Sequence, residues 1–253
     1  MNLTALLRLA ALALVLGSAS VYATDADEPA IFAIPEVWPW GYAGRYGSPE
    51  GSLVDLAHQL VTRADLPVKY ELRPHRRAIT ELLRGEVDFV VLFESPRLAD
   101  EAIDLGPVVT TRAIMTGLRS SDVVLTLEGL RGKPVAFVHG TYYGEAFARA
   151  QGIHKFAVRD IFQALEMLKL GRVSAILCSD QAIYHTLASL DLSPEDFRMR
   201  NFRAGQEGHL YMSRRALHPE LEDEMRAALE SLRQDGTLDS IFALPGNNSP
   251  LNP

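Results

Sequence analysis

The chain has 253 residues, of which 47% are hydrophobic and 23% charged, and its formal net charge at pH 7 is −7. This composition is ordinary for a globular protein, and the length suffices for one large domain or two small ones. The acidic balance and the lack of any cluster of Lys and Arg argue against nucleic acid as a partner. The single cysteine, Cys178, excludes an internal disulfide, and no cysteine near the N-terminus could accept a lipid anchor.

The first residues are typical of a secretory signal peptide. Arg8 precedes an apolar run from Leu9 to Leu16, and small residues follow up to the sequence VYA, which ends at Ala23. The run is too short to span a bilayer, although a buried amphipathic helix is an alternative. We therefore predict that residues 1–23 are a signal peptide cleaved after Ala23, and that the protein is exported to the periplasm without a membrane anchor.

Strand and helix signals alternate along the rest of the chain. Apolar residues at helical spacing predict a helix over 52–64, Gly85 is a C-cap residue for a second helix, and Asp160 with Gln163 predicts a capping box at the start of a third. The expected strands cover 30–37, 67–73, 87–93, 112–119, 134–138, 173–179, 197–203 and 209–215, and the expected helices cover 52–64, 76–85, 139–152, 159–172, 180–190 and 219–236, with a short closing segment at 237–242.

This alternation predicts an α/β protein built from two units, each with a mostly parallel sheet covered by helices. Ligands of such folds gather beyond the carboxyl ends of the strands. The residues that directly follow the expected strands are therefore the candidates for a functional site.

Signals for catalysis are weak. The seven histidines show no spacing typical of metal ligands, and the sequence has no Gly-x-Ser-x-Gly elbow, no phosphate-binding Walker loop and no dinucleotide fingerprint. Glu94 and Asp180 both follow expected buried strands and could form a pair of carboxylates for acid/base chemistry, but nothing else indicates one. We expect no metal and no cofactor.

Signals for binding are stronger. Gly140 and Thr141 directly precede an expected helix, where free backbone N–H groups favour an anion such as a carboxylate, although Thr141 could equally be a plain N-cap. Arg97 follows the strand at 87–93 and could present its planar guanidinium to a carboxylate. Asp180 could pair with a ligand ammonium, or simply cap the helix that it opens.

Both tryptophans of the chain flank a proline in the sequence EVWPWGYAG. We expect Pro39 to end the first strand, Trp38 to face a cleft as a stacking platform, and Trp40 to cover a core. Structural packing of both indoles is the alternative.

Taken in order, these segments resemble the family 3 extracellular solute-binding proteins, the periplasmic amino-acid-binding type found in ABC transporters. The resemblance is carried by the turn WPW, by GSLVDLAHQL and PHRRAITELLRGEVDFVV, by LRGKPVAFVHGTYYGEAF and FQALEMLKLGRVSAILCSDQA, and by the closing LEDEMRAALESLRQDGTLDSIF. It covers essentially the whole mature chain. No single segment is specific by itself, and the order of the segments carries the likeness.

The resemblance implies the type II fold of periplasmic binding proteins, in which two lobes joined by two crossing strands close on a ligand. We place the crossings near residues 112–119 and 207–213. Residues 24–115 and 210–253 would then form the first lobe, and residues 116–209 the second.

The resemblance also implies roles for particular residues. An Arg after the third strand of lobe one grips the ligand's α-carboxylate, which corresponds to Arg97, and the Gly140–Thr141 turn assists it. An Asp at the end of a strand in lobe two takes the α-ammonium, which corresponds to Asp180. An aromatic residue from the first turn stacks on the ligand, which corresponds to Trp38.

One segment departs from the family pattern. Residues 88–97 are fewer than the family has here, so Arg97 could miss the carboxylate, and Arg76 or Arg77 could replace it. Glu94, if it points into the cleft, would disfavour an acidic ligand and favour one that carries an amine.

Three functions are compatible with these observations. The first is a monomeric binding protein, not an enzyme, that captures an amino acid or a similar small zwitterion or amine and delivers it to the membrane permease of an ABC importer. The second is a periplasmic sensor that docks on a membrane receptor. The third is a dehydratase-like enzyme on the same scaffold that would use a carboxylate in the cleft, such as Glu94.

Overall fold

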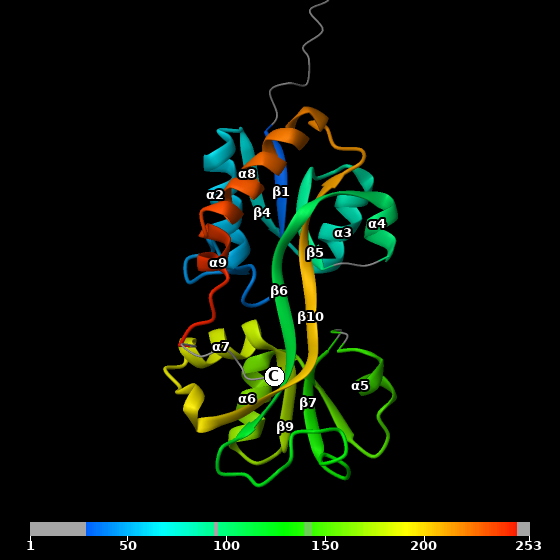
Figure 1. Cartoon of the computed structure of the whole chain (residues 1–253), viewed down its shortest axis with the longest axis vertical. Coiled ribbons are helices and arrows are strands. Elements are labelled where there is room, and N and C mark those ends of the chain that lie inside the picture. Colours follow the sequence, from blue (N-terminus) through cyan, green and yellow to red (C-terminus); the bar gives the residue numbers. More distant parts are fainter. Residues whose placement is uncertain (1–28, 94–95, 140, 142, 247–253) are drawn as a thin grey trace, which may run out of the picture.

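The computed structural model describes residues 29–93, 96–139, 141 and 143–246, and the predicted signal peptide lies outside this part. The molecule has two lobes, one above the other, with two long strands running between them (Figure 1). None of the helices in the described part of the chain combines the length and the apolar character needed to cross a membrane.

The upper lobe contains the N-terminal third of the chain and its C-terminal helices. Its strands are β1 (Ala30–Pro35), β2 (Tyr42–Ala43), β3 (Pro49–Glu50), β4 (Val68–Arg73) and β5 (Phe89–Phe93), and its helices are α2 (Ser52–Ala64), α3 (His75–Arg84), α4 (Pro96–Glu101), α8 (Glu222–Gln234) and α9 (Thr237–Ile241), with a 3-10 turn η2 at Pro219–Leu221.

The lower lobe contains the middle of the chain. Its strands are β7 (Pro134–Val138), β8 (His154–Val158) and β9 (Ala175–Ser179), and its helices are α5 (Glu145–Arg149), α6 (Ile161–Lys169) and α7 (Asp180–Ser189), with a 3-10 turn η1 at Pro194–Asp196. The strands β6 (Ala102–Leu118) and β10 (Phe197–Ser213) belong to both lobes.

The strand order is β4-β1-β5-β10-β6-β9-β7-β8. In the upper lobe β1 is parallel to both β4 and β5, and in the lower lobe β7 is parallel to both β8 and β9. β10 pairs antiparallel with β5 above, β6 pairs antiparallel with β9 below, and β6 and β10 pair with each other along their length. Each lobe is therefore a mostly parallel sheet completed by the two connecting strands.

The two connecting strands are longer than the sequence signals predict. The segments 197–203 and 209–215, expected as two strands, form the single strand β10, and the strand expected at 112–119 begins at Ala102 as part of β6. Their pairing is irregular between Asn201 and Gln206, where the chain passes from one lobe to the other. The division into lobes at residues 115 and 209 stays a proposal, although β6 already pairs with β9 of the lower lobe at Ala113.

Helix ends follow the capping rules. Gly85 ends α3 in the left-handed conformation, at φ 78°, and its N–H bonds to the carbonyls of Glu81 and Leu82. Asp160 Oδ1 accepts a hydrogen bond from the N–H of Gln163, whose side-chain oxygen accepts one from the N–H of Arg159. The predicted capping box thus forms, with its return bond one residue earlier than expected.

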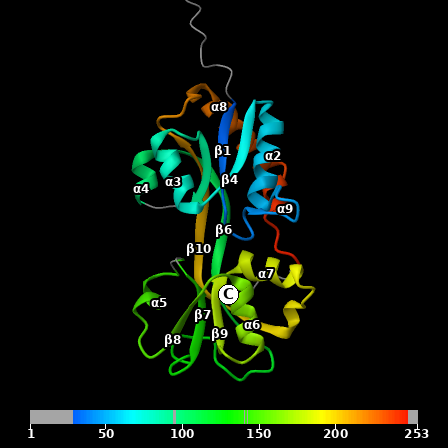
Figure 2. The same cartoon turned by 180° about the vertical axis from the view of Figure 1, so that it is seen from behind.

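Each lobe has its own hydrophobic core on both faces of its sheet. In the upper lobe α2, α8 and α9 cover one face and α3 the other, and in the lower lobe α6 and α7 cover one face and α5 lies on the other (Figures 1 and 2). The helix expected over 139–152 shortens to the five residues of α5, and strand β8 and helix α4 were not predicted.

Candidate functional site

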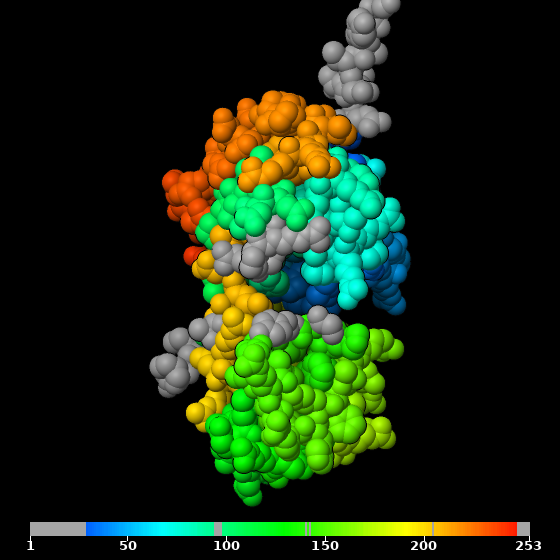
Figure 3. Space-filling model, turned by 90° about the vertical axis from the view of Figure 1, so that its right-hand side faces the viewer, coloured from blue at the N-terminus to red at the C-terminus, as the bar shows by residue number. Residues whose placement is uncertain are grey.

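The gap between the lobes is where the ends of the parallel strands meet. β1, β4 and β5 of the upper lobe end toward it, and so do β7 and β9 of the lower lobe, while β6 and β10 form its back wall (Figure 1). Figure 3 shows the hollow between the lobes in side view. This is the position at which α/β folds bind small molecules.

Trp38 lies in the turn after β1 and reaches the lower lobe. Its Nε1 donates a hydrogen bond of 2.9 Å to Thr186 Oγ1 on α7, and its ring centroid lies 5.2 Å from that of Phe162 on α6. The ring centroid of Tyr42, which belongs to the same lobe as Trp38, lies 4.7 Å from that of Trp38. The indole is half-buried and joins the two lobes, so its role as a stacking platform for a ligand stays a prediction.

Trp40 and Pro39 serve the upper lobe. Trp40 is buried and packs against Phe93 and Phe242, with ring centroids 5.9 and 6.0 Å away. The peptide bond between Trp38 and Pro39 is cis. The proline thus separates one indole that faces the other lobe from one that belongs to the core.

The arginines at the start of α3 differ in their partners. The carboxylate of Glu81, almost fully buried, accepts hydrogen bonds from Arg73 Nε at 2.9 Å and from Arg77 Nε at 2.5 Å. Arg76 is exposed and makes no ion pair with any described residue. Of the two alternative carboxylate binders, Arg77 thus pairs through its Nε with Glu81 of its own helix, and Arg76 makes no such pair with the described residues.

Several predicted residues cannot be placed. Glu94 and Gly140 lie outside the described residues. Arg97 is the second residue of α4, but its side chain also lies outside the described part. Thr141 is exposed at the end of the β7 turn, where its N–H bonds to the carbonyl of Val138 over 3.3 Å. Tyr143, two residues further on, is buried, and burial raises the pKa of its phenol far above the ordinary value.

Asp180 follows β9 and is 3% exposed, but its carboxylate is bound within the protein. Its Oδ2 accepts a hydrogen bond from Arg112 Nε at 3.0 Å, and its Oδ1 accepts one from the N–H of Arg112 at 3.2 Å and one from the N–H of Gln181 at 2.8 Å. Arg112 lies on the connecting strand β6. The N-cap of α7 is Ser179, whose Oγ accepts a hydrogen bond from the N–H of Ala182. Asp180 therefore pairs with the back wall of the gap.

Helix α7 makes a contact with the rest of the molecule through each of three buried polar side chains. Asp180 binds Arg112 of the connecting strand, Thr186 binds Trp38 of the upper lobe, and Gln181 Nε2 donates a hydrogen bond of 2.8 Å to the carbonyl of Phe242, which follows α9. The sequence analysis missed Arg112, Gln181 and Thr186. A signal for the first was a charged residue between the two threonines at 110 and 111 and the apolar run that starts at Ala113, but nothing local marked the other two.

Two of the predicted ligand-binding residues therefore meet at α7: Asp180 is its first residue, and Trp38 contacts it through Thr186. Arg76 and Arg97 come from α3 and α4 on the other face of the upper lobe (Figures 1 and 2). Among the described residues no hydrogen bond or ion pair joins Arg76 or Arg77 to Thr141 or Asp180.

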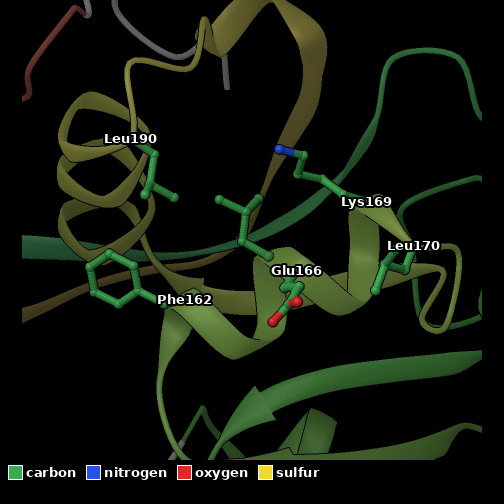
Figure 4. A pocket seen from close by; sticks show the side chains of 6 residues that line it. Phe162, Glu166, Lys169, Leu170 and Leu190 are labelled. Atoms are coloured by element: carbon green, nitrogen blue, oxygen red, sulfur yellow. The ribbon is translucent and has the colours of Figure 1, made fainter.

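Two hollows of the surface lie in the lower lobe. One, of about 370 Å³, lies between α6 and α7, and Figure 4 shows Phe162 and Leu190 on one side of it with Lys169 and Leu170 on the other. The other, of about 380 Å³, lies beside α5 and is lined by Tyr143 to Ala146 and by Phe202 and Arg203. None of the predicted ligand-binding residues that the structure describes lines either one.

Nothing in the described part of the chain favours a bound metal, because no three His, Cys, Asp or Glu side chains gather there. Cys178 is fully buried in β9, and this burial raises the pKa of its thiol to about 12. A thiol with so high a pKa is a poor nucleophile at neutral pH.

The sequence profile of the bacterial extracellular solute-binding proteins, family 3, matches residues 31–243. Comparison with curated proteins finds no match.

Solved structures share the fold at low sequence identity. A mutant of the arginine-binding protein from T. maritima is 18% identical with a TM-score of 0.64, over 85% of this chain and 93% of that one. An ancestral cationic amino acid solute-binding protein is 17% identical with a TM-score of 0.69, over 85% and 93%. A histidine kinase sensor domain with similarity to periplasmic binding proteins is 20% identical with a TM-score of 0.67, over 86% and 95%. These likenesses confirm the predicted two-lobed α/β fold.

Proposed function

The chain belongs to the bacterial extracellular solute-binding proteins of family 3, and we propose that it captures a small solute bearing a carboxylate between its lobes. One observation carries this proposal: the carboxyl ends of the parallel strands of both lobes meet at one gap, and the strands β6 and β10 connect the lobes behind it. A solute in that gap would touch loops from both lobes and could draw them together.

The carboxylate would be held from above by Arg76. Its guanidinium is exposed at the start of α3 and is free of ion pairs with the described residues, whereas Arg73 and Arg77 are held by Glu81. A planar guanidinium can donate two parallel hydrogen bonds to one carboxylate. Thr141, exposed in the lower lobe, would contact the same solute from below.

We propose delivery to the permease of an ABC importer as the purpose of capture, with the protein acting as a periplasmic monomer after removal of residues 1–23. The amino-acid-binding relatives support this reading, since two of the similar structures bind arginine or cationic amino acids by name. A sensor would use the same gap, and a histidine kinase sensor domain shares the fold. Catalysis is not part of the proposal, because Asp180, the carboxylate that directly follows β9, is engaged by Arg112.

A thermal-shift screen over amino acids, polyamines and small carboxylates tests the proposal. A solute that binds only the folded protein stabilises it by about 2.7 kcal/mol at a hundredfold excess over its Kd. We expect a rise in Tm with carboxylate-bearing compounds, and we expect Arg76→Gln to reduce it. Arg84→Gln is the control, because Arg84 is also exposed on the same helix but lies at its other end, beside Glu86.

The outcome is decided by two comparisons. No shift with any compound, or equal shifts in Arg76→Gln and Arg84→Gln, would contradict the proposed site. Co-purification of the liganded protein with a permease or with a membrane receptor then separates the importer from the sensor.

A further inference from the structure

We propose that Arg112 is a specificity-determining residue, which occupies Asp180 so that the gap selects carboxylates without an α-ammonium group. This inference rests on the proposed function and narrows its ligand class. Asp180 would be the acceptor for a ligand ammonium only if its oxygens were open to the gap, and in this structure they are not.

The carboxylate of Asp180 is almost saturated by the protein itself. An ionised carboxylate offers about four lone-pair positions. Three receive N–H groups, two from Arg112 and one from Gln181, and the side chain is only 4% exposed. A ligand ammonium would have to displace the Arg112 guanidinium from the buried carboxylate with which it already pairs, so the carboxylate would only exchange one cation for another and Arg112 would lose its partner.

Arg112, in contrast, keeps capacity toward a ligand. Its side chain is 33% exposed, and only its Nε and its backbone N–H bond to Asp180. Its two terminal NH₂ groups donate to none of the described residues, and they form the part of a guanidinium that grips a carboxylate in parallel. The back wall of the gap therefore presents hydrogen-bond donors where an amino-acid site would present an acceptor.

The other charges around the gap support an anionic guest. Glu81 is held by Arg73 and Arg77, while Arg76 makes no ion pair with the described residues. Glu36 after β1 and Glu50 at the end of β3 are exposed acids near the first turn that also lack an ion pair with the described residues. The acids that remain open near the first turn are thus exposed to solvent, whereas the buried carboxylate of Asp180 is already paired with a cation.

Pairs of compounds that differ only in the α-ammonium provide the test, and glutarate with glutamate and succinate with aspartate are suitable. Calorimetry on the full mature chain should show tighter binding of the compound without the amine in each pair. In Arg112→Met, which keeps an unbranched stem but removes the guanidinium and its charge, Asp180 becomes available. The ratio of affinities should then shift toward the aminated compound by about tenfold or more, the size of one charge-assisted hydrogen bond.

Asp180→Asn gives a second, opposite readout in case Arg112→Met does not fold. The asparagine side chain still accepts the two backbone N–H groups through its oxygen, but its NH₂ cannot accept from Arg112. The released guanidinium should bind carboxylates several-fold more tightly. If Asp180 instead bound the ligand ammonium, the same substitution would abolish binding of the aminated compounds.

Three outcomes separate this inference from the proposed function. A wild-type preference for glutamate and aspartate, whether through Asp180 or Glu36, overturns the role of Arg112 and leaves solute capture standing. An affinity ratio unchanged in a folded Arg112→Met also overturns it. If neither these four compounds nor any compound of the thermal-shift screen binds, the proposed function is overturned, and this inference with it.

Discussion

The indole Nε1 of Trp38 donates a hydrogen bond of 2.9 Å to Thr186 Oγ1, and this bond joins the first turn of the upper lobe to α7 of the lower lobe. Thr186 is fully buried, and its hydroxyl in turn donates to the carbonyl of Ala182, so the threonine is a fixed acceptor. Phe162 packs beside the same indole. The contact lies on the α7 side of the gap and resists separation of the lobes there.

We predict that Trp38 and Thr186 are energetically coupled. Thr186→Val keeps the shape of the side chain but removes the acceptor, and it should lower the free energy of unfolding by about 1–2 kcal/mol because the indole N–H loses its partner. Trp38→Phe removes the donor and part of the packing. The double variant should lose less than the sum of the two by about 0.5–1 kcal/mol, as measured by urea unfolding.

Trp40 supplies the control for this coupling. It lies two residues further along the same turn but packs in the core of the upper lobe against Phe93 and Phe242. Trp40→Phe combined with Thr186→Val should therefore be additive within about 0.5 kcal/mol. Additivity for Trp38 as well would mean that the hydrogen bond does not form in solution.

The segment after α9 makes a second contact with α7. Gln181 Nε2 donates to the carbonyl of Phe242, and Leu244 packs against the hydrophobic core of the lower lobe. The chain therefore returns from the upper lobe to α7 after its last helix, as Figure 1 shows in red. This segment connects the lobes in addition to β6 and β10.

We predict that Gln181→Glu destabilises the protein at neutral pH. The side chain keeps its size, but a buried carboxylate would face the carbonyl of Phe242 in place of an N–H donor, which should cost at least about 2 kcal/mol of the free energy of unfolding. The loss should shrink on acidification, since a protonated carboxyl group can donate to that carbonyl. Gln151→Glu, at an exposed position, should change the stability by less than about 0.5 kcal/mol. A similar loss in both variants would contradict the contact.

Most of the fold followed from local patterns because each element of the lobes buries a regular face. The strand β5 is buried on both sides and reads as an apolar run, and α3 ends at a glycine in the left-handed conformation. The first part of β6, before residue 112, was not predicted, because its burial repeats at every third residue, at Ala102, Leu105 and Val108, which matches neither a strand nor a helix. A twisted strand that runs between two cores can have such a pattern.

The site was only partly predictable for a different reason. Strand ends and helix starts identified Trp38 and Asp180, but their partners depend on contacts between distant parts of the chain. Thr186 lies 148 residues from Trp38, and Asp180 lies 68 residues from Arg112. A single sequence carries no signal for such pairs. We therefore expected Asp180 to bind a ligand and did not predict its pairing with Arg112.

Cys178 should be unreactive in the folded protein. Burial raises the pKa of its thiol to about 12, so the thiolate that reacts with disulfide reagents is scarce at pH 8. We expect labelling by a chromogenic disulfide to be limited by unfolding and to accelerate in urea in parallel with the loss of structure. Rapid and complete labelling without denaturant would show that β9 is open to solvent.

The acid sensitivity of the upper lobe should depend in part on Asp235. Hydrogen bonds from Thr237, followed by the one from Arg63, lower the pKa of its carboxyl from 3.8 to about 2. A carboxyl with a lowered pKa stabilises the folded state above its ordinary pKa, and this contribution is lost as the pH falls toward the lowered value. Asp235→Asn should therefore lower Tm at about pH 6, and the difference from the wild type should shrink between pH 3.8 and about 2. Calorimetric scans across this range check it, and a difference that does not depend on pH would mean that the asparagine disturbs the start of α9 instead of removing a charge.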